Sequence, residues 1–149
     1  RGRMRVRRAI ATDYAAMLDI WLDASRAGHP FLAEQVLQEQ SRIVRDTYFP
    51  QAENWVIEHG GIKGFIGLIG NHIGGLFVAP AAHGQGFGRS LVEHASGRLG
   101  SLTVEVYEQN EGAIAFYRRC GFAPVGRKER DDEGRPLPLL RLERGSQAR

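Results

Sequence analysis

A glycine-rich loop stands between an apolar run and an amphipathic pattern near the middle of the chain. Residues 73–78 predict a strand, Pro80 follows, and the loop then has the sequence Gly84-Gln85-Gly86-Phe87-Gly88 before a helical pattern that runs to about residue 99. Glycines at such a junction let the backbone turn tightly and aim several N–H groups at one spot beside a helix N-terminus. The loop predicts an anion site suited to a pyrophosphate, although an ordinary strand-to-helix turn would explain the glycines equally well.

Two other phosphate-binding motifs fail on spacing. A Walker loop needs Gly-Lys followed by Ser or Thr, whereas Gly88 is followed by Arg89 and Ser90. A dinucleotide fingerprint has the spacing G-x-G-x-x-G and opens the first strand–helix–strand unit, whereas this loop has a different spacing and follows at least four predicted strands. Neither class of nucleotide site is therefore predicted.

The hydrophobic periodicity predicts one mixed α/β domain spanning residues 1–149. The expected order is a strand, two helices, three strands, a helix, a strand, a helix and a terminal hairpin. In residue ranges, this order is 4–9, 12–28, 34–47, 55–57, 63–69, 73–78, 86–99, 102–107, 110–120, 122–125 and 137–142. Residues 1–3 are expected to be a remnant ahead of a native start at Met4, and residues 144–149 a flexible tail.

Helix ends are predicted from capping residues. Thr12 offers an N-cap to the first helix and Gly28 closes it, while Pro50 is expected to lie beyond the end of the second helix. Asn110 can cap the last helix, and Gly121 follows it where a left-handed residue is wanted.

Composition narrows the class of protein. No apolar run approaches the ~20 residues that span a bilayer, and the single cysteine, Cys120, fits a reducing compartment, so we expect the cytoplasm and no membrane partner. The formal charge of +3 comes from dispersed arginines without a nucleic-acid-binding motif, which favours an anionic cofactor over nucleic acid. The spacing of the histidines predicts no metal site.

Two segments together resemble one family. Residues 76–92, LFVAPAAHGQGFGRSLV, resemble the acetyl-CoA signature of the GNAT N-acetyltransferase superfamily, and residues 110–122, NEGAIAFYRRCGF, resemble its second motif, N-x-x-A-x-x-F-Y-x-x-x-G-F. The resemblance extends from Met4 to about Glu143. Within the superfamily it is similar to the YjaB-type bacterial acetyltransferases, through the segments 29–32, 108–111 and 138–140.

The resemblance implies a fold and a reaction. The fold is a mostly antiparallel central sheet that splays between its fourth and fifth strands and is flanked by about four helices. The reaction is transfer of an acetyl group from acetyl-CoA (coenzyme A is the product) to a primary amine by direct attack in a ternary complex, the amine being a small molecule, a peptide N-terminus or a protein lysine. A non-catalytic acyl-CoA sensor is the alternative. The protein could be a monomer or a homodimer.

The resemblance also assigns the cofactor site. The backbone of Phe77 and Val78 is expected to bind the pantetheine arm, with the Val78 N–H facing the thioester oxygen. His83 stands where the family usually has Gln or Arg, which implies weaker or pH-dependent binding. The expected cofactor-binding residues are Phe77, Val78, His83, Gly84, Gln85, Gly86, Phe87, Gly88, Arg89, Asn110 and Tyr117.

The catalytic roles are assigned with alternatives. By resemblance, Tyr117 protonates the departing CoA thiolate, although a core tyrosine would fit the same helix pattern. An amine of pKa ~10.4 needs about 4–5 kcal/mol to lose its proton at pH 7, so a base is required, and His72, His29 and Glu105 are the candidates. His29, Phe31 and Leu32 are candidates for the acceptor pocket, or Phe31 and Leu32 simply pack between the helices.

Overall fold

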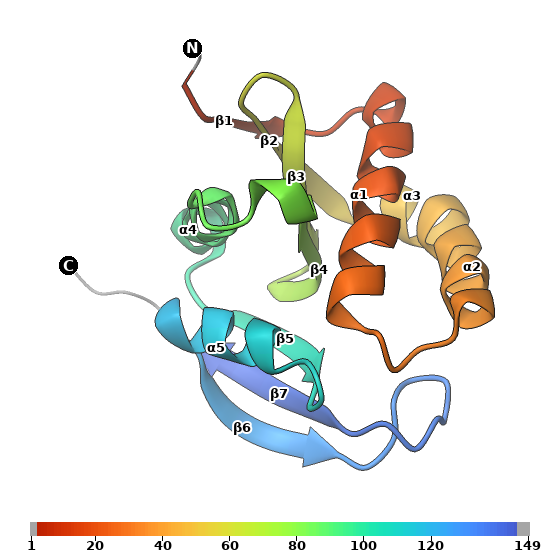
Figure 1. Cartoon of the computed structure of the whole chain (residues 1–149). Coiled ribbons are helices and arrows are strands. Elements are labelled where there is room, and N and C mark those ends of the chain that lie inside the picture. Colours follow the sequence, from red (N-terminus) through yellow and green to blue (C-terminus); the bar gives the residue numbers. More distant parts are fainter. Residues whose placement is uncertain (1–2, 146–149) are drawn as a thin grey trace.

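Seven strands form one sheet in the order β1-β2-β3-β4-β5-β7-β6 in the computed structural model, which describes residues 3–145. The strands are β1 (Arg5–Arg8), β2 (Glu53–Glu58), β3 (Ile62–Ile69), β4 (His72–Val78), β5 (Leu102–Tyr107), β6 (Ala123–Lys128) and β7 (Leu139–Arg144). The helices are α1 (Tyr14–Gly28), α2 (Glu34–Ile43), α3 (Phe49–Gln51), α4 (Phe87–Leu99) and α5 (Glu111–Arg119). Helices α1 to α3 cover one face of the sheet, and α4 and α5 cover the other (Figure 1).

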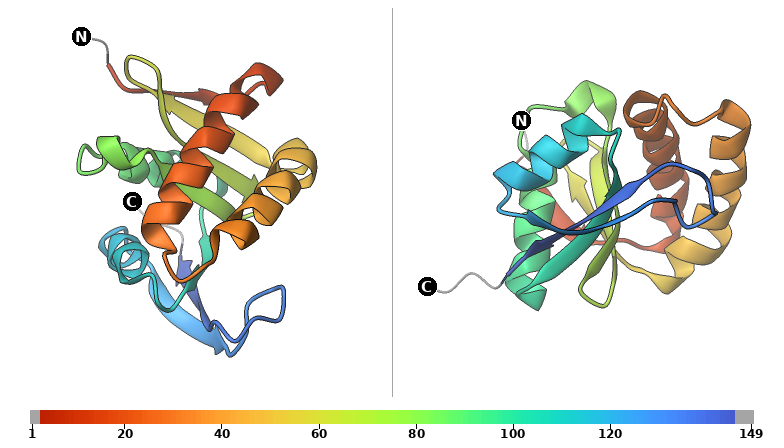
Figure 2. Two further views of the ribbon diagram at one scale, coloured as in Figure 1. Left: turned by 45° about the vertical axis from the view of Figure 1, so that its right-hand side comes forward. Right: turned by 90° about the horizontal axis from the view of Figure 1, so that it is seen from below.

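The sheet separates into two halves between β4 and β5. These strands are parallel and pair only over His72–Thr103 and Ile73–Val104, whereas every other neighbouring pair is antiparallel. Beyond Ile73 the two strands diverge, and the half formed by β5, β7 and β6 turns away from the rest (Figure 2). The predicted splay between the fourth and fifth strands is therefore confirmed.

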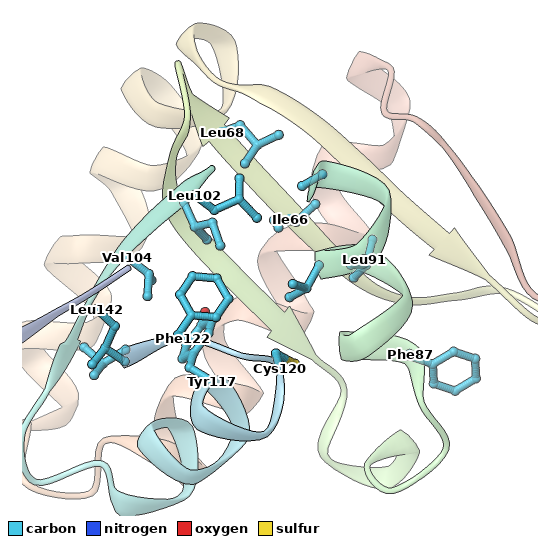
Figure 3. Packing of buried hydrophobic residues seen from close by; sticks show 14 of the residues in the cluster. Ile66, Leu68, Phe87, Leu91, Leu102, Val104, Tyr117, Cys120, Phe122 and Leu142 are labelled. Carbon is cyan, nitrogen blue, oxygen red and sulfur yellow. The ribbon is translucent and has the colours of Figure 1, made fainter. Parts of the chain in front are cut away.

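Side chains alternate between the two faces of the splayed strands. Ile66 and Ile73 belong to the core under α4 and α5, together with Leu102 and Val104 of β5 (Figure 3). Phe65 belongs instead to the core under α1 and α2. Each such fully buried side chain stabilises the fold by about 1.5–3 kcal/mol. The open end of the splay thus lies between two packed cores, one on each face of the sheet.

Three of the five predicted helix ends are confirmed and two are wrong. Helix α1 ends at Gly28, Asn110 caps α5 by accepting the Ala113 N–H at 3.1 Å, and Gly121 has a φ of +94°. Thr12 is not a cap, because it lies inside a short 3₁₀ turn. The buried carboxylate of Asp13 supplies the hydrogen bond at the start of this turn instead, because it accepts the Ile10 N–H at 2.8 Å. The same carboxylate binds Arg7.

The expected end of the second helix before Pro50 is also wrong. Helix α2 ends at Ile43, a π-helical turn follows over 44–48, and α3 then contains Pro50 in its first turn, where the missing N–H costs nothing. The wide turn is closed by the Phe49 N–H, which donates to the Val44 carbonyl. It directs Tyr48 across β3 and β4, where the Tyr48 hydroxyl lies against Gly67 and Gly74.

Strand β7 extends into the segment that was predicted to be a flexible tail. Strand β7 includes Arg144, whose guanidinium is buried and pairs with Glu93 of α4 at 3.2 Å, so Arg144 belongs to the sheet although it was assigned to the expected tail. Residues 1–2 and 146–149 lie outside the described residues. Between residues 3 and 145, no helix combines the length and the apolarity needed to cross a membrane.

Candidate active site

The open edge of β4 exposes backbone hydrogen-bonding groups. The Ala79 N–H donates to the Lys63 carbonyl at 2.9 Å, and the same register pairs Gly64 with Val78, Phe65 with Phe77 and Ile66 with Leu76. Antiparallel pairs alternate between hydrogen-bonded and non-hydrogen-bonded. The polar groups of Phe77 therefore face β3, whereas those of Leu76 and Val78 face the gap toward β5.

The Val78 carbonyl has a partner from the same chain. The His83 Nε2–H donates to this oxygen at 3.0 Å, although the His83 ring is otherwise exposed. The residue that departs from the family signature therefore folds back onto the open edge of β4. A ligand that used the Val78 carbonyl would have to displace this ring.

The glycine-rich loop forms a cradle of N–H groups. Gly84 and Gly86 have φ values of +82° and +86°, and α4 begins directly after them at Phe87. Within the described residues, the six N–H groups from Gly84 to Arg89 have no hydrogen-bond acceptor, and the ladder of α4 starts with the Ser90 N–H donating to Gly86. Free N–H groups at a helix N-terminus bind anions, as a pyrophosphate would require.

Two neighbours shape this cradle. A side chain on Gly88 would lie only 3.1 Å from the Phe116 ring of α5, so glycine lets the first turn of α4 approach α5 closely. The exposed Arg89 guanidinium donates to the Arg119 carbonyl at 3.4 Å, which holds this cation at the end of α5. Phe87 itself is buried and packs against His59, so its side chain fixes the loop rather than facing solvent.

Tyr117 lies on α5 in the core beneath the splay. Its ring packs edge-on against Phe122 (Figure 3). It also packs edge-on against Phe116, and only 5% of the residue is exposed. Within the described residues its hydroxyl has no hydrogen-bond partner. Burial raises the pKa of Tyr117 well above its ordinary value, and the nearby Cys120 and Tyr48 raise this pKa further. The hydroxyl therefore keeps its proton at neutral pH.

A cavity of about 350 Å³ lies on the other face of β4, between α2 and the loop that joins β6 to β7. Its floor is the β4 segment that carries Gly74 and Gly75, where the register with β3 shifts by one residue and Gly74 forms a bulge. Its lining residues are Trp21, Gln40, Ile43, Val44, Tyr48, Phe49, Phe65, Gly74, Gly75, Phe77, Asp132 and Glu133. The cavity and the splay thus share the middle of β4.

The candidate bases lie near this cavity without lining it. His72 and Glu105 lie on the sheet face that carries the cavity, because their neighbours Ile73 and Val104 face the opposite core. His72 Nδ1 shares a hydrogen bond of 2.8 Å with Thr103 Oγ1, and burial lowers the His72 pKa. Glu105 pairs with Lys128 at 3.3 Å.

The connector between α1 and α2 packs against the end of β5. His29 and Phe31 contact the Tyr107 ring with centroids 5.1 and 5.2 Å away, and burial lowers the His29 pKa to about 4. Leu32 is buried in the core beneath α1 and α2. None of these connector residues lines the cavity. Asn110 lies next to Gly28 at the start of α5, where its side chain serves as the cap.

A splayed sheet with a free strand edge, an N–H cradle at the end of that strand and a cavity on the reverse side define an acyl-CoA-dependent acyltransferase. The strand edge suits the pantetheine arm, the cradle suits the pyrophosphate, and the cavity gives a second substrate access to the same strand. Between residues 3 and 145, no group of three metal-ligating side chains converges.

The chain belongs to the GNAT family: residues 50–124 match the acetyltransferase (GNAT) domain. It is 40% identical over 139 residues to the peptidyl-lysine N-acetyltransferase YjaB of Escherichia coli (strain K12), which covers 92% of this chain and 94% of YjaB. The solution structure of apo YjaB from Escherichia coli has a TM-score of 0.88 at 37% identity, and covers 98% of this chain and 100% of that one. PaiA N-acetyltransferase from Thermoplasma acidophilum, solved with coenzyme A, shares the fold at a TM-score of 0.78 and 14% identity, with 97% and 99% covered.

The protein is therefore an N-acetyltransferase that transfers an acetyl group from acetyl-CoA to a primary amine. The cofactor-binding and catalytic residues predicted from the sequence do not include Leu76, Tyr48, Asp132 and Glu133. Leu76 could be found only once the register with β3 was known. Asp132 and Glu133 lie between the two strands of the predicted terminal hairpin, and nothing in the local sequence indicates that this connection borders the cavity.

Proposed function

We propose that the protein acetylates lysine side chains of other proteins, with acetyl-CoA bound in the splay and the lysine entering through the cavity. The observation that carries this proposal is the shared middle of β4: the glycine bulge is the floor of the cavity and also borders the splay. An amine in the cavity and a thioester in the splay would therefore meet at one strand. The lysine acceptor is supported by the similarity to YjaB, a peptidyl-lysine N-acetyltransferase.

In this proposal the backbone of the chain holds the cofactor. Val78, and Leu76 in place of Phe77, offer N–H and C=O groups to the pantetheine arm, and the N–H groups of residues 84–89 bind the pyrophosphate with Arg89 beside them. The ring of His83 leaves the Val78 carbonyl when the arm binds. Because the pyrophosphate cradle at residues 84–89 lies beyond the Val78 end of β4, the thioester end of the cofactor lies deeper in the splay. An N–H of Leu76 or Val78 is then the donor that stabilises the negative charge on the thioester oxygen.

The reaction is a direct attack in a ternary complex. The amine lone pair attacks the thioester carbon, the tetrahedral intermediate collapses, and the C–S bond breaks. The departing sulfur takes a proton from the Tyr117 hydroxyl, which is protonated at neutral pH because burial raises its pKa. In this proposal the buried hydroxyl meets the cofactor sulfur through the open splay.

We assign the removal of the amine proton to His72, acting directly or through water. His72 lies two residues from the Gly74 bulge on the cavity face, its lowered pKa keeps it neutral at pH 7, and its hydrogen bond with Thr103 fixes the ring. Glu105 is engaged with Lys128, and His29, with a pKa of about 4, is a weaker base. His72→Ala should lower kcat and remove the acidic limb of the pH profile; an unchanged profile would move the assignment to Glu105 or His29.

The decisive experiment follows thiol release from acetyl-CoA with a lysine peptide whose N-terminus is blocked. Tyr117→Phe should reduce kcat about 100-fold, in the range of a lost general acid, while calorimetry gives an unchanged affinity for coenzyme A. Tight binding of coenzyme A without turnover of any amine by the unaltered protein would instead support the non-catalytic sensor. We also propose a cytoplasmic location, supported by the single buried thiol of Cys120, and no nucleic-acid partner.

A further inference from the structure

The charged side chains that line the acceptor cavity are negative. Aromatic and aliphatic side chains form its walls and Gln40 is polar. Between residues 3 and 145, the charged residues that line it are Asp132 and Glu133 alone. Both belong to the exposed loop between β6 and β7, and their side chains are 68% and 48% exposed. We call this pair the acidic lip, because it borders the mouth of the cavity, opposite α2.

The acidic lip is held in place by a buried carboxylate. Asp131 accepts the Tyr107 hydroxyl at 2.9 Å and the N–H groups of Glu133 and Arg135 at 3.1 and 2.8 Å. The Asp131 side chain is only 2% exposed. A buried carboxylate with three donors fixes the loop to the end of β5, so the position of the lip relative to the cavity is set by the fold.

Neighbouring cations only partly neutralise the lip. Lys128 binds Asp132 at 3.0 Å but also pairs with Glu105, and Arg135 binds Glu133 at 2.9 Å but also pairs with Asp131. The ion pairs of this region share three cations, Arg127, Lys128 and Arg135, among six carboxylates: Glu105, Glu108, Glu129, Asp131, Asp132 and Glu133. A negative potential therefore remains at the mouth of the cavity, and among the described residues no cation lines the cavity to oppose it.

The walls and the mouth of the cavity would contact different parts of the acceptor peptide. The methylene stem of a lysine suits the aromatic walls formed by Trp21, Tyr48 and Phe77, and its amine must lose its charge before attack. The residues next to that lysine in a peptide cannot enter the cavity and stay at the mouth. Cationic neighbours are attracted to the acidic lip there, and anionic neighbours are repelled.

Building on the proposed function, we propose that Asp132 and Glu133 determine acceptor specificity by selecting lysines that lie next to basic residues in the substrate protein. The lip acts on binding and does not take part in bond formation. Its effect is therefore carried by KM, with kcat nearly constant. Because the lip is solvent-exposed, its effect weakens as ionic strength rises.

The test compares three N-terminally blocked peptides, each with one lysine flanked on both sides by arginine, serine or glutamate. Arginine supplies the charge without a second acceptor amine. The unaltered protein should prefer the arginine peptide over the glutamate peptide by roughly 20-fold in kcat/KM. The double variant Asp132→Asn, Glu133→Gln should reduce this ratio to about threefold or less, with kcat retained.

Matched controls separate the lip from charge in general. Asp19→Asn removes an exposed carboxylate of α1 that does not line the cavity, and the ratio should stay unchanged. Tyr107→Phe removes one anchor of Asp131 and should lower the ratio partway. A ratio that the double variant leaves intact would overturn the inference, whereas failure of all three peptides despite coenzyme A binding would overturn the proposed function itself.

Discussion

His83 is the residue at which this chain departs from the family signature, and its hydrogen bond with Val78 gives that departure a physical consequence. In the proposed binding mode, the cofactor replaces this hydrogen bond when it enters the splay. An exposed neutral hydrogen bond contributes about 0.5–1.5 kcal/mol. We therefore predict that His83→Ala lowers the dissociation constant of acetyl-CoA about two- to tenfold, measured by titration calorimetry.

A matched substitution checks the cause. The side-chain amide of His83→Gln can still donate to the Val78 carbonyl, so this variant should bind acetyl-CoA with nearly the affinity of the unaltered protein. If His83→Ala binds the cofactor more weakly, His83 contacts the bound cofactor rather than competing with it.

At the scale of elements, the bulge of β4 and the π-helical turn depend on each other. The turn places the Tyr48 ring across β4, and a side chain on Gly74 would overlap the Tyr48 hydroxyl and ring. We predict that Gly74→Ala lowers the free energy of unfolding by about 1–3 kcal/mol, as overpacking does, in urea denaturation. It should also lower kcat/KM, because the floor of the cavity moves.

Two further variants isolate this cause. Gly97→Ala in α4 meets no atom within 4 Å, so it should leave stability unchanged or raise it by up to about 1 kcal/mol. In a Tyr48→Ala background the cost of Gly74→Ala should largely disappear, as a double-mutant cycle would report. A full cost without Tyr48 would mean that the backbone of the bulge, not the tyrosine, excludes a side chain.

These elements also show which parts of the fold could be predicted from the sequence and which could not. The order of helices and strands along the chain, the splay, the glycine-rich turn before α4 and the Asn110 cap could be predicted, because the acetyl-CoA signature and the second motif each combine local periodicity with fixed spacing. The continuation of the helical segment through Pro50 could not be predicted, because a π-helical turn leaves no signal in the local sequence and is stabilised by tertiary packing. The sequence does not show that the backbone groups of Leu76, and not those of Phe77, face the gap, because a shift of one residue in register exchanges these groups.

At the scale of the whole molecule, the connector between α1 and α2 should make stability depend on pH. The pKa of His29 is about 6.5 in the unfolded chain and about 4 in the folded one, because burial against Phe31 and Tyr107 disfavours the charged ring. Between these values the unfolded chain binds the additional proton, so stability is complete above pH 6.5 and falls as the pH drops toward 4.

The measurement compares the unaltered protein with His29→Phe. Because the ring is only partly shielded from water, we expect the difference between their free energies of unfolding to change by about 1–2 kcal/mol between pH 7 and pH 4.5. The other groups that titrate in this range cancel in the difference. A constant difference would mean that the His29 ring is as hydrated in the folded protein as in the unfolded chain.

The splay leads to one more prediction, because it leaves the two halves of the sheet joined over only two residue pairs of β4 and β5. In the free protein the N–H of Phe77 bonds to β3, while the N–H groups of Leu76 and Val78 face the gap. Amide hydrogen exchange followed by NMR should therefore alternate along β4: slow at Phe77 and fast at Leu76 and Val78. Coenzyme A at 100 times its dissociation constant should stabilise the fold by about 2.7 kcal/mol and slow Leu76 and Val78 as well, since its pantetheine arm then pairs with this edge. Uniform protection along β4 in the free protein would mean that the splay is closed, and a cofactor that left Leu76 and Val78 fast would have to bind elsewhere.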